Sequence, residues 1–291
     1  MNANKIYPWY FNISALFLYV ILFFVPSVIG LFYSFTDWNG YSDIVKFVGL
    51  KNFHDIFFSN NSMYLAFITN TLKFTFFSII IKTFLSFALA LLLTTGVRMT
   101  NLHRMIAFSP QVLSFMIIGL IFKGILHPTT GLLNITLRSV GLGAIATDWL
   151  GNARTALASI IGVDAWKGVG FGMVIFIAGI QTIPYTYYES ADIDGASYIQ
   201  KTFRITIPFL VPTIVMNIIF HLIYGLRVFD IIYVLTNGGP GYATDTINTA
   251  VLRQFGTGNY AMGTALSSIL ALFTVLISYF IIKGLDRKVE Y

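Results

Sequence analysis

The chain has 291 residues, of which 56% are hydrophobic and only 10% are charged. Soluble domains carry about 25% charged residues, so this chain has too little polar surface for a soluble protein and is too apolar to be disordered. The absence of cysteine excludes disulfides, thiolate metal sites and a cysteine nucleophile. The net charge of +6 comes without a basic stripe of the kind that binds nucleic acid, so no such partner is expected. An integral membrane protein remains.

Six stretches are long and apolar enough to cross a bilayer, which takes about 20 residues per helix. The chain is therefore predicted to be all-α, a polytopic membrane protein with six transmembrane helices. The predicted spans are Asn12–Phe35, Phe67–Thr95, Met105–Leu126, Thr155–Thr182, Pro208–Phe229 and Tyr260–Lys283. No small-x-small cleavage site follows the first span, so it is expected to remain as an anchor.

The positive-inside rule indicates the orientation, because cytoplasmic loops carry the excess of lysine and arginine. With both termini inside, the inner segments hold Lys5, Arg98, Arg104, Lys201, Arg204, Lys283, Arg287 and Lys288. The outer segments hold fewer, namely Lys46, Lys51, Arg138, Arg154 and Arg253. Both termini are therefore predicted to be cytoplasmic.

The inner loop 183–207 is long and polar, and its pattern predicts two short helices joined by a turn. Thr186 with Glu189, and Ser197 with Gln200, have the capping-box spacing of a helix start. Gly195 between them suits the left-handed conformation that ends a helix. We expect helices near 187–194 and 198–206, with a boundary at Pro208. An apolar stripe on the second helix favours docking to a partner; the alternative is a loop that packs under its own bundle.

The segment E-S-A-D-I-D-G-A-S, followed by I-T-I-P, resembles the cytoplasmic loop of permease subunits of binding-protein-dependent ABC importers. The family pattern is E-A-A, three residues, G, nine residues, I-x-L-P. It falls here on Glu189, Ser190, Ala191, Gly195, Ile205, Ile207 and Pro208, with serine and isoleucine replacing the usual second alanine and the leucine.

Other segments resemble the carbohydrate-uptake, maltose-type members of this family. They are Phe47–Phe53, Gly131–Asn134, Val163–Phe171 and Leu235–Thr246. In the last of these, Gly238, Gly239 and Pro240 predict a tight turn whatever the function. The resemblance implies a type I ABC importer transmembrane core at 67–283 with its coupling loop at 183–207. An N-terminal anchor helix and outer loop would occupy 1–66, and a cytoplasmic tail 284–291.

The resemblance also implies partners. The coupling site would consist of Glu189, Ala191, Asp194, Gly195 and Pro208, seated on a cytoplasmic ATPase. Two ATPase subunits, a second and different permease, and an external or periplasmic solute-binding protein would complete a sugar importer in the bacterial cell membrane. The chain has no G-x-x-x-x-G-K-[ST] motif, so ATP and Mg²⁺ are expected on the ATPase subunits and no cofactor on this chain, which is not itself an enzyme.

Charged residues deep inside predicted spans should face protein or water. Lys82 lies near the middle of the second span and should face a partner helix or a cavity. Asp164 and Lys167 are three residues apart, and a local pair between them is expected in preference to a functional site. The neighbouring glycines 168, 170 and 172 are expected to permit close helix packing rather than phosphate binding.

Asn217, His221 and Tyr224 form a polar stripe at i, i+4 and i+7 on the fifth span. Lipid would leave their hydrogen-bonding groups unsatisfied, so the stripe must face the bundle or a watery path. Family geometry favours a substrate pathway, with Phe171 as a further lining residue; hydrogen bonding between helices is the alternative.

Other functions are less well supported by the sequence. One is an ABC importer permease for a solute other than sugar. A stand-alone secondary transporter would need an ion-coupling carboxylate, and Asp164 is the only acidic residue well inside a span. A membrane enzyme is disfavoured further, because no H-E-x-x-H or G-x-S-x-G occurs.

Overall fold

The structure is a computed structural model that describes residues 10–59, 62–94 and 98–289. Within these ranges the chain is helical, with one isolated bridge between Thr36 and Phe47 and no β-strand. Lys5 and the last two residues of the predicted tail lie outside the described ranges. The chain divides into two compact units, each described by itself.

The first unit comprises Met1–Leu65 and Ala250–Leu272. Its helical segments are α1 (Phe11–Tyr19), a π-helical turn (Val20–Phe24), α2 (Val25–Tyr33), α3 (Lys51–Phe58) and parts of α14 (Ile247–Gly256) and α15 (Tyr260–Val289). Residues Asn12–Tyr33 form one apolar helical run whose side chains are not buried within this chain. Such a helix suits contact with lipid rather than with its own core.

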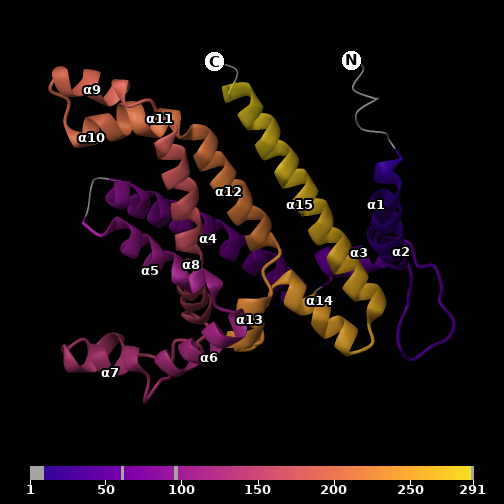
Figure 1. The fold of residues 1–291 in the computed structure, drawn as a ribbon. Coiled ribbons are helices and arrows are strands. Elements are labelled where there is room, and N and C mark those ends of the chain that lie inside the picture. Colours follow the sequence, from indigo (N-terminus) through magenta and orange to yellow (C-terminus); the bar gives the residue numbers. More distant parts are fainter. Residues whose placement is uncertain (1–9, 60–61, 95–97, 290–291) are drawn as a thin grey trace. The chain divides into compact units, whose positions relative to one another are not determined.

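The second unit comprises Ala66–Thr249 and Phe273–Tyr291. Its helices are α4 (Ser62–Thr94), α5 (Thr100–Val112), α6 (Phe115–Ile125), α7 (Leu132–Ser139), α8 (Ala156–Gln181), α9 (Thr186–Ile193), α10 (Tyr198–Lys201), α11 (Ile207–Phe209), α12 (Val211–Leu226) and α13 (Asp230–Leu235). Helix α8 is the core of this unit and packs against α5, α12 and α13 (Figure 1).

Glycines let the neighbouring helices approach α8 closely. A Cβ at Gly170 would meet the backbone of Ala107 and Phe108 in α5, and one at Gly172 would meet Ser86 in α4. Gly168 lies against the side chain of Lys82. The prediction that these glycines serve helix packing is confirmed.

Two predicted spans are not single straight helices. Instead of one helix over Met105–Leu126, α5 and α6 meet at a bend of 99°. Instead of one over Pro208–Phe229, a helical run Tyr198–Phe209 meets α12 at 68°. Both bends follow a proline, which lacks the backbone N–H that a continuous helix needs: Pro110 lies inside α5, and Pro208 precedes the bend by two residues. Among the residues that the structure describes, four unbroken candidate spans remain, or up to six if each bent pair crosses. The six-span count and the cytoplasmic termini therefore stay predictions.

The inner loop forms the predicted helix-turn-helix, which we call the coupling hairpin (Thr186–Thr206). Gly195 has φ of +70° and ends α9. The N–H of Ala196 bonds to Ala191 O at 2.9 Å and that of Gly195 to Asp192 O at 3.1 Å, the Schellman pattern. The hairpin lies at the opposite end of this unit from α6 and α7 (Figure 1).

One of the two predicted capping boxes forms. Ser197 and Gln200 bond each other's backbone N–H at 3.3 and 2.8 Å. The predicted box at Thr186 and Glu189 is wrong, because Thr186 is already helical and α9 has Tyr185 at its N-cap without a side-chain bond. Beyond Ser197 the chain continues through a π-helical turn (Thr202–Thr206) into α11, so the helix extends past the predicted boundary at Pro208.

The predicted turn after α13 is confirmed. Asn237, Gly238 and Gly241 have φ of +50°, +86° and +60°, and the bond between Gly239 and Pro240 is cis. Thr244 Oγ1 donates to Gly239 O at 2.7 Å, which closes the turn.

Candidate functional site

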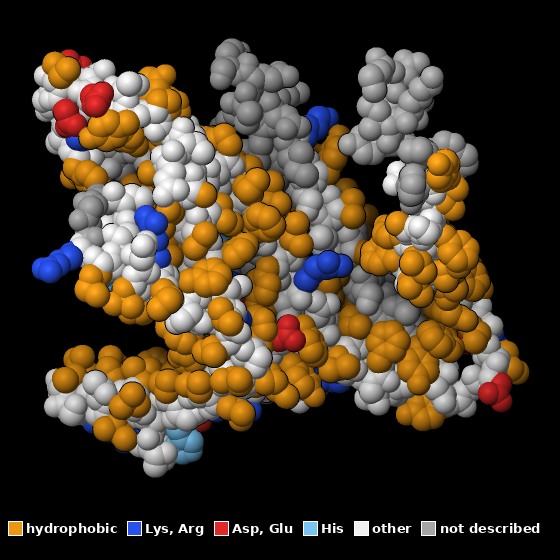
Figure 2. Space-filling view, viewed as in Figure 1, with side chains coloured by type: hydrophobic (Ala, Val, Ile, Leu, Met, Phe, Trp, Pro, Cys, Tyr) orange, Lys and Arg blue, Asp and Glu red, His pale blue; other side chains and the backbone are white. Residues whose placement is uncertain are grey.

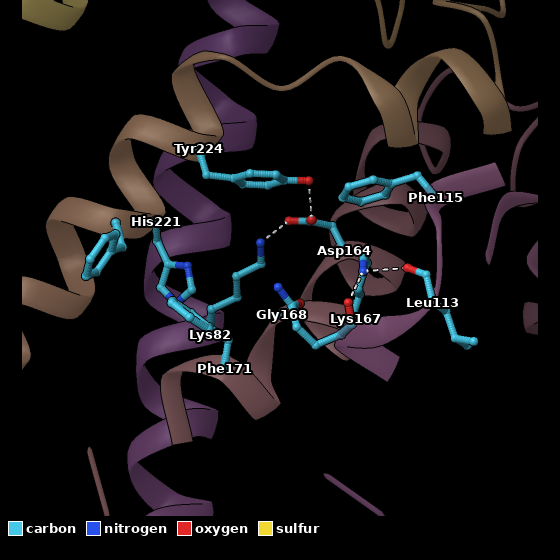
Figure 3. Close-up of a pocket in the computed structure, with 11 residues that line it drawn as sticks. Lys82, Leu113, Phe115, Asp164, Lys167, Gly168, Phe171, His221 and Tyr224 are labelled. Carbon is cyan, nitrogen blue, oxygen red and sulfur yellow. Dashed lines mark hydrogen bonds and ion pairs between the residues drawn. The ribbon is translucent and has the colours of Figure 1, made fainter. Parts of the chain in front are cut away.

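A cavity of about 420 Å³ lies among the membrane helices of the second unit, and we call it the span cavity. It is lined from α4, from the break between α5 and α6, from α8 and from α12. The lining residues are Lys82, Gln111, Leu113, Phe115, Asp164, Lys167, Gly168, Phe171, Phe220, His221 and Tyr224 (Figure 3). Aromatic side chains and a few polar groups share its wall, the mixture usual for a small-molecule site.

Asp164 is the centre of a buried polar group on one wall of this cavity. Its Oδ2 lies 2.6 Å from Lys82 Nζ and accepts from Ser78 Oγ at 3.0 Å, and its Oδ1 accepts from the Tyr224 hydroxyl at 3.0 Å. Lys82 Nζ also lies 4.4 Å above the Tyr224 ring. We call Ser78, Lys82, Asp164 and Tyr224 the Asp164 cluster, and Figure 3 shows the last three of these residues. It joins α4, α8 and α12 at one point.

The expected pair between Asp164 and Lys167 does not form. Asp164 pairs instead with Lys82, which confirms that Lys82 faces a partner helix and a cavity. Lys167 reaches the broken end of α5, where its Nζ donates to the carbonyls of Gln111 and Leu113 at 2.9 and 2.8 Å. It also lies 4.7 Å from the centre of the Phe115 ring. A cation at the C-terminal carbonyls of a helix is favoured by the helix dipole.

The polar stripe on α12 faces inward, as predicted, but its members have different surroundings. His221 is 5% exposed, lines the span cavity, and has an Nε2 with no hydrogen-bond partner among the described residues. Tyr224 is committed to Asp164. Asn217 is fully buried beside Gly172 and Ser86, away from the cavity lining, and its Oδ1 is 3.4 Å from Thr83 Oγ1.

Phe171 lines the span cavity and packs edge-on against Phe220, with ring centres 5.9 Å apart. Trp166 on the same helix packs on Phe122 and is absent from the cavity wall.

Sequence reasoning missed the polar face of α4. Its members are Thr71, Thr75, Ser78, Lys82 and Ser86, all at most 3% exposed. Their spacing of four, three, four and four residues keeps them on one side of a helix, so the same periodicity that revealed the α12 stripe could have found them. Gln111 and Phe115 carried no such pattern, because they reach the cavity only through the bend between α5 and α6.

The coupling hairpin presents the residues of its sequence motif at its surface. Glu189, Asp194, Gly195 and Pro208 are exposed, while Ala191 is buried. Figure 2 shows acidic side chains gathered over this end, beside hydrophobic ones. Ile193, Ile199 and Phe203 are 88, 68 and 67% exposed, an apolar surface of the kind that marks a protein contact. The pair between Lys201 Nζ and Asp192 Oδ1, at 2.6 Å, ties the two arms together.

Metal chemistry finds no support in this arrangement. Across the part of the chain that the structure describes, no three histidine, aspartate or glutamate side chains gather where they could hold a metal ion.

Comparison with known proteins gives consistent matches along the chain. A family model described as binding-protein-dependent transport system inner membrane component matches residues 74–291. The multiple sugar-binding transport system permease protein MsmF of Streptococcus mutans is 33% identical over 291 residues, covering 99% of this chain and 97% of that protein. The trehalose/maltose transport system permease protein MalF of Thermococcus litoralis is 32% identical over 278 residues, covering 94% and 91%.

Solved structures agree with the sequence relatives. A chain of a bacterial ABC transporter involved in the import of the acidic polysaccharide alginate superposes with a TM-score of 0.83 at 27% identity, covering 97% of this chain and 96% of that chain. A bacterial alginate ABC transporter in complex with an alginate pentasaccharide-bound periplasmic protein gives a TM-score of 0.83 at 26% identity, with 97% and 94% covered.

Proposed function

The chain belongs to the family of inner membrane components of binding-protein-dependent transport systems. From that premise we propose that the chain conducts an incoming sugar through the span cavity, while separate subunits hydrolyse ATP. Membership confirms the predicted all-α ABC importer permease, its multi-pass membrane location and its role as a transport subunit rather than an enzyme. The substrate, the route and the full set of partners are the proposal.

The observation that carries the route is the span cavity with its unpaired His221 Nε2. Leaving a buried polar atom without a partner costs about 1–3 kcal/mol, so a group that passes through the cavity and bonds to it is favoured. The Phe171 and Tyr224 side chains offer aromatic surface for the C–H faces of a sugar ring, and the imidazole offers a partner for hydroxyls. Related permeases named for multiple sugars and for trehalose and maltose support the same substrate class.

Assembly with partners follows from the coupling hairpin. Its exposed Glu189, Asp194 and Gly195 and its apolar surface suit a groove on a cytoplasmic ATPase, with buried Ala191 keeping α9 close to its own unit. The proposal includes a second, different permease, two such ATPase subunits that hold ATP and Mg²⁺, and an external binding protein that delivers the sugar. Movement of the hairpin would transmit ATPase closure to α8 and α12, which flank the loop and line the span cavity.

Reconstitution tests this function. The chain is placed in proteoliposomes with the companion permease, the ATPase and the binding protein encoded beside it, and sugar-stimulated ATP hydrolysis and uptake are measured. We expect both only in the complete assembly. Uptake by this chain alone without ATP, or stimulation by non-sugar solutes only, would overturn the proposal.

The role of the α12 stripe needs its own test, because helix packing is the alternative. We expect His221→Phe to change the uptake rate or sugar preference while the assembly elutes intact. Asn217→Leu is the matched control, since Asn217 lies outside the cavity and should act on stability instead. Loss of assembly in the His221 variant with no change in sugar preference would assign the stripe to packing.

A further inference from the structure

A second cavity lies wholly within the first unit, outside the span cavity, and we call it the loop cavity. Its volume is about 300 Å³. The lining residues are Asp37, Trp38, Asn39, Tyr41, Asn52, Tyr64, Gln254, Asn259, Ala261 and Met262. Most come from two segments, the loop after α2 and the stretch 254–262 from α14 to α15, which are more than 200 positions apart in the sequence. Asn52 of α3 and Tyr64 of α4 complete the lining.

Backbone hydrogen bonds hold the two segments together. Gly40 N donates to Gly258 O at 2.8 Å, and Ala261 N donates to Trp38 O at 2.9 Å. The Tyr41 hydroxyl donates to Thr257 O at 3.1 Å. The Trp38 ring lies between Tyr33 and Tyr260, with ring centres 4.2 and 4.7 Å away. The cavity is therefore a built feature of the fold rather than a gap between mobile loops.

Gln254 is the residue that indicates a ligand. Its side chain is 7% exposed and lines the cavity, yet it makes no hydrogen bond to any residue that the structure describes. Its amide is not among the fully buried side-chain atoms that lack a partner, so it is accessible within the cavity lining and free to bond a ligand there. Gln254 can both donate and accept, which is what a sugar hydroxyl requires of its partner.

Asp37 sets the charge of the cavity. Of the described residues in the lining, it is the only charged one. Its Oδ1 accepts from the backbone N–H of Lys46 at 2.6 Å, which fixes the carboxylate, while no described group bonds its Oδ2. A fixed carboxylate accepts hydroxyl hydrogens and repels other anions. The site thus favours an uncharged hydroxylated ligand over a sugar acid or a sugar phosphate.

From these observations we infer that the loop cavity is a second sugar-binding site, separate from the membrane route, which takes one or two rings of an uncharged sugar. A volume of about 300 Å³ is at the lower end for ligand cavities, and the amides of Gln254 and Asn259 and the Asp37 carboxylate supply its polar contacts. The assignment rests on the proposed function for the class of cargo. The predicted orientation puts both segments on the outer side, where the sugar arrives.

The natural lack of cysteine gives a direct test in the full transporter complex. Met262 is half-buried and lines the cavity without supplying a polar contact, so a Met262→Cys variant is labelled with a maleimide while maltose, trehalose, sucrose, glucose, galacturonate or Tris is added. At about ten times its Kd a bound sugar leaves roughly a tenth of the sites open, so we expect labelling to slow about tenfold with at least one uncharged sugar. Galacturonate and the amine Tris should not protect. An Ile44→Cys variant, in the loop after α2 but outside the cavity lining, should be labelled at an unchanged rate.

Adding Gln254→Leu should remove the protection, whereas Gln181→Leu, outside this cavity, should leave it. Protection by none of the uncharged sugars, equal protection by galacturonate or by Tris, or protection that survives Gln254→Leu would overturn the inference. Sugar-stimulated ATP hydrolysis is measured on the same preparations. Failed protection with intact stimulation removes the loop cavity site alone, while absent stimulation by every sugar counts against the proposed function.

Discussion

Asp164 connects three membrane helices through three donors, and each donor comes from α4 or α12. A buried ion pair contributes little net stability, because desolvation of both charges offsets their attraction. Its effect is on geometry: Ser78, Lys82 and Tyr224 can all reach the carboxylate only when the three helices hold one relative position. The Asp164 cluster therefore fixes the wall of the span cavity rather than serving as a free binding group.

Removing one partner of the Lys82–Asp164 ion pair should lower the free energy of unfolding more than removing both partners. Lys82→Met leaves the Asp164 carboxylate buried without its counter-charge, and we expect the free energy of unfolding to fall by about 3–5 kcal/mol. The double variant with Asp164→Leu should recover part of that loss, because it removes the unpaired charge but leaves the Ser78 and Tyr224 hydroxyls without their acceptor. Denaturant unfolding in detergent measures both, with Lys123→Met, an exposed lysine on α6, as the control. A double variant no more stable than Lys82→Met would contradict the argument.

At the scale of single elements, the break between α5 and α6 is held by a side chain from a third helix. Pro110 cannot donate a backbone bond, and Ser114 begins the next helix by accepting from Ile117 N at 3.3 Å. The carbonyls of Gln111 and Leu113 are left at the end of α5, and Lys167 of α8 satisfies them. A hydrogen-bond donor from α8 thus satisfies the carbonyl groups that the bend leaves open.

Lys167→Met should loosen this bend. Each carbonyl left unpaired costs about 1–3 kcal/mol where water does not replace the donor, so we expect faster amide hydrogen exchange over residues 111–118 and lower thermal stability. Lys123→Met, which is remote from the bend carbonyls, should change neither. Unchanged exchange over 111–118 in the Lys167 variant would show that the bend holds without this cation.

The coupling hairpin depends on Gly195 for its backbone. A Cβ there would meet nothing within 4 Å in this chain, so the cost of a side chain comes from φ of +70° rather than from a clash. A left-handed residue with a Cβ costs about 1–2 kcal/mol. We expect Gly195→Ala to lower sugar transported per ATP hydrolysed, and Gly195→Asn, which tolerates this conformation, to restore part of it. If asparagine is worse than alanine, contact with the ATPase rather than the backbone determines the residue.

Some local features of these elements could be predicted from sequence, whereas the long-range contacts could not. The Ser197 box and the Gly195 turn involve residues within five positions, so their patterns specified them. Asp164 was assigned to Lys167 because that lysine is three residues away, whereas its true partner Lys82 is on another helix. The sequence prediction does not include the bend near Leu113, because the apolar stretch Met105–Leu126 is long enough for one continuous span. Pro110 and Ser114 within that stretch are nevertheless residues typical of a helix boundary.

At the scale of the whole molecule, the scarce charged residues have distinct positions. Lys82, Asp164 and Lys167 are internal and committed to protein partners. Glu189, Asp192, Asp194, Lys201 and Arg204 belong to the coupling hairpin. The lysine and arginine residues in the other loops determine the orientation of the chain in the membrane. This orientation can be tested without a transport measurement.

Asn101 and Ser139 provide that test, because they flank the bent pair α5 and α6 and both are exposed. In the naturally cysteine-free chain, Asn101→Cys and Ser139→Cys are each treated with a membrane-impermeant maleimide in intact cells and again after permeabilisation. If the bent pair crosses the membrane and the termini are cytoplasmic, Ser139→Cys is labelled in intact cells and Asn101→Cys only after permeabilisation. Labelling of both from the same side would make the pair a re-entrant loop and remove one span. The opposite pattern would reverse the orientation predicted from the lysine and arginine bias.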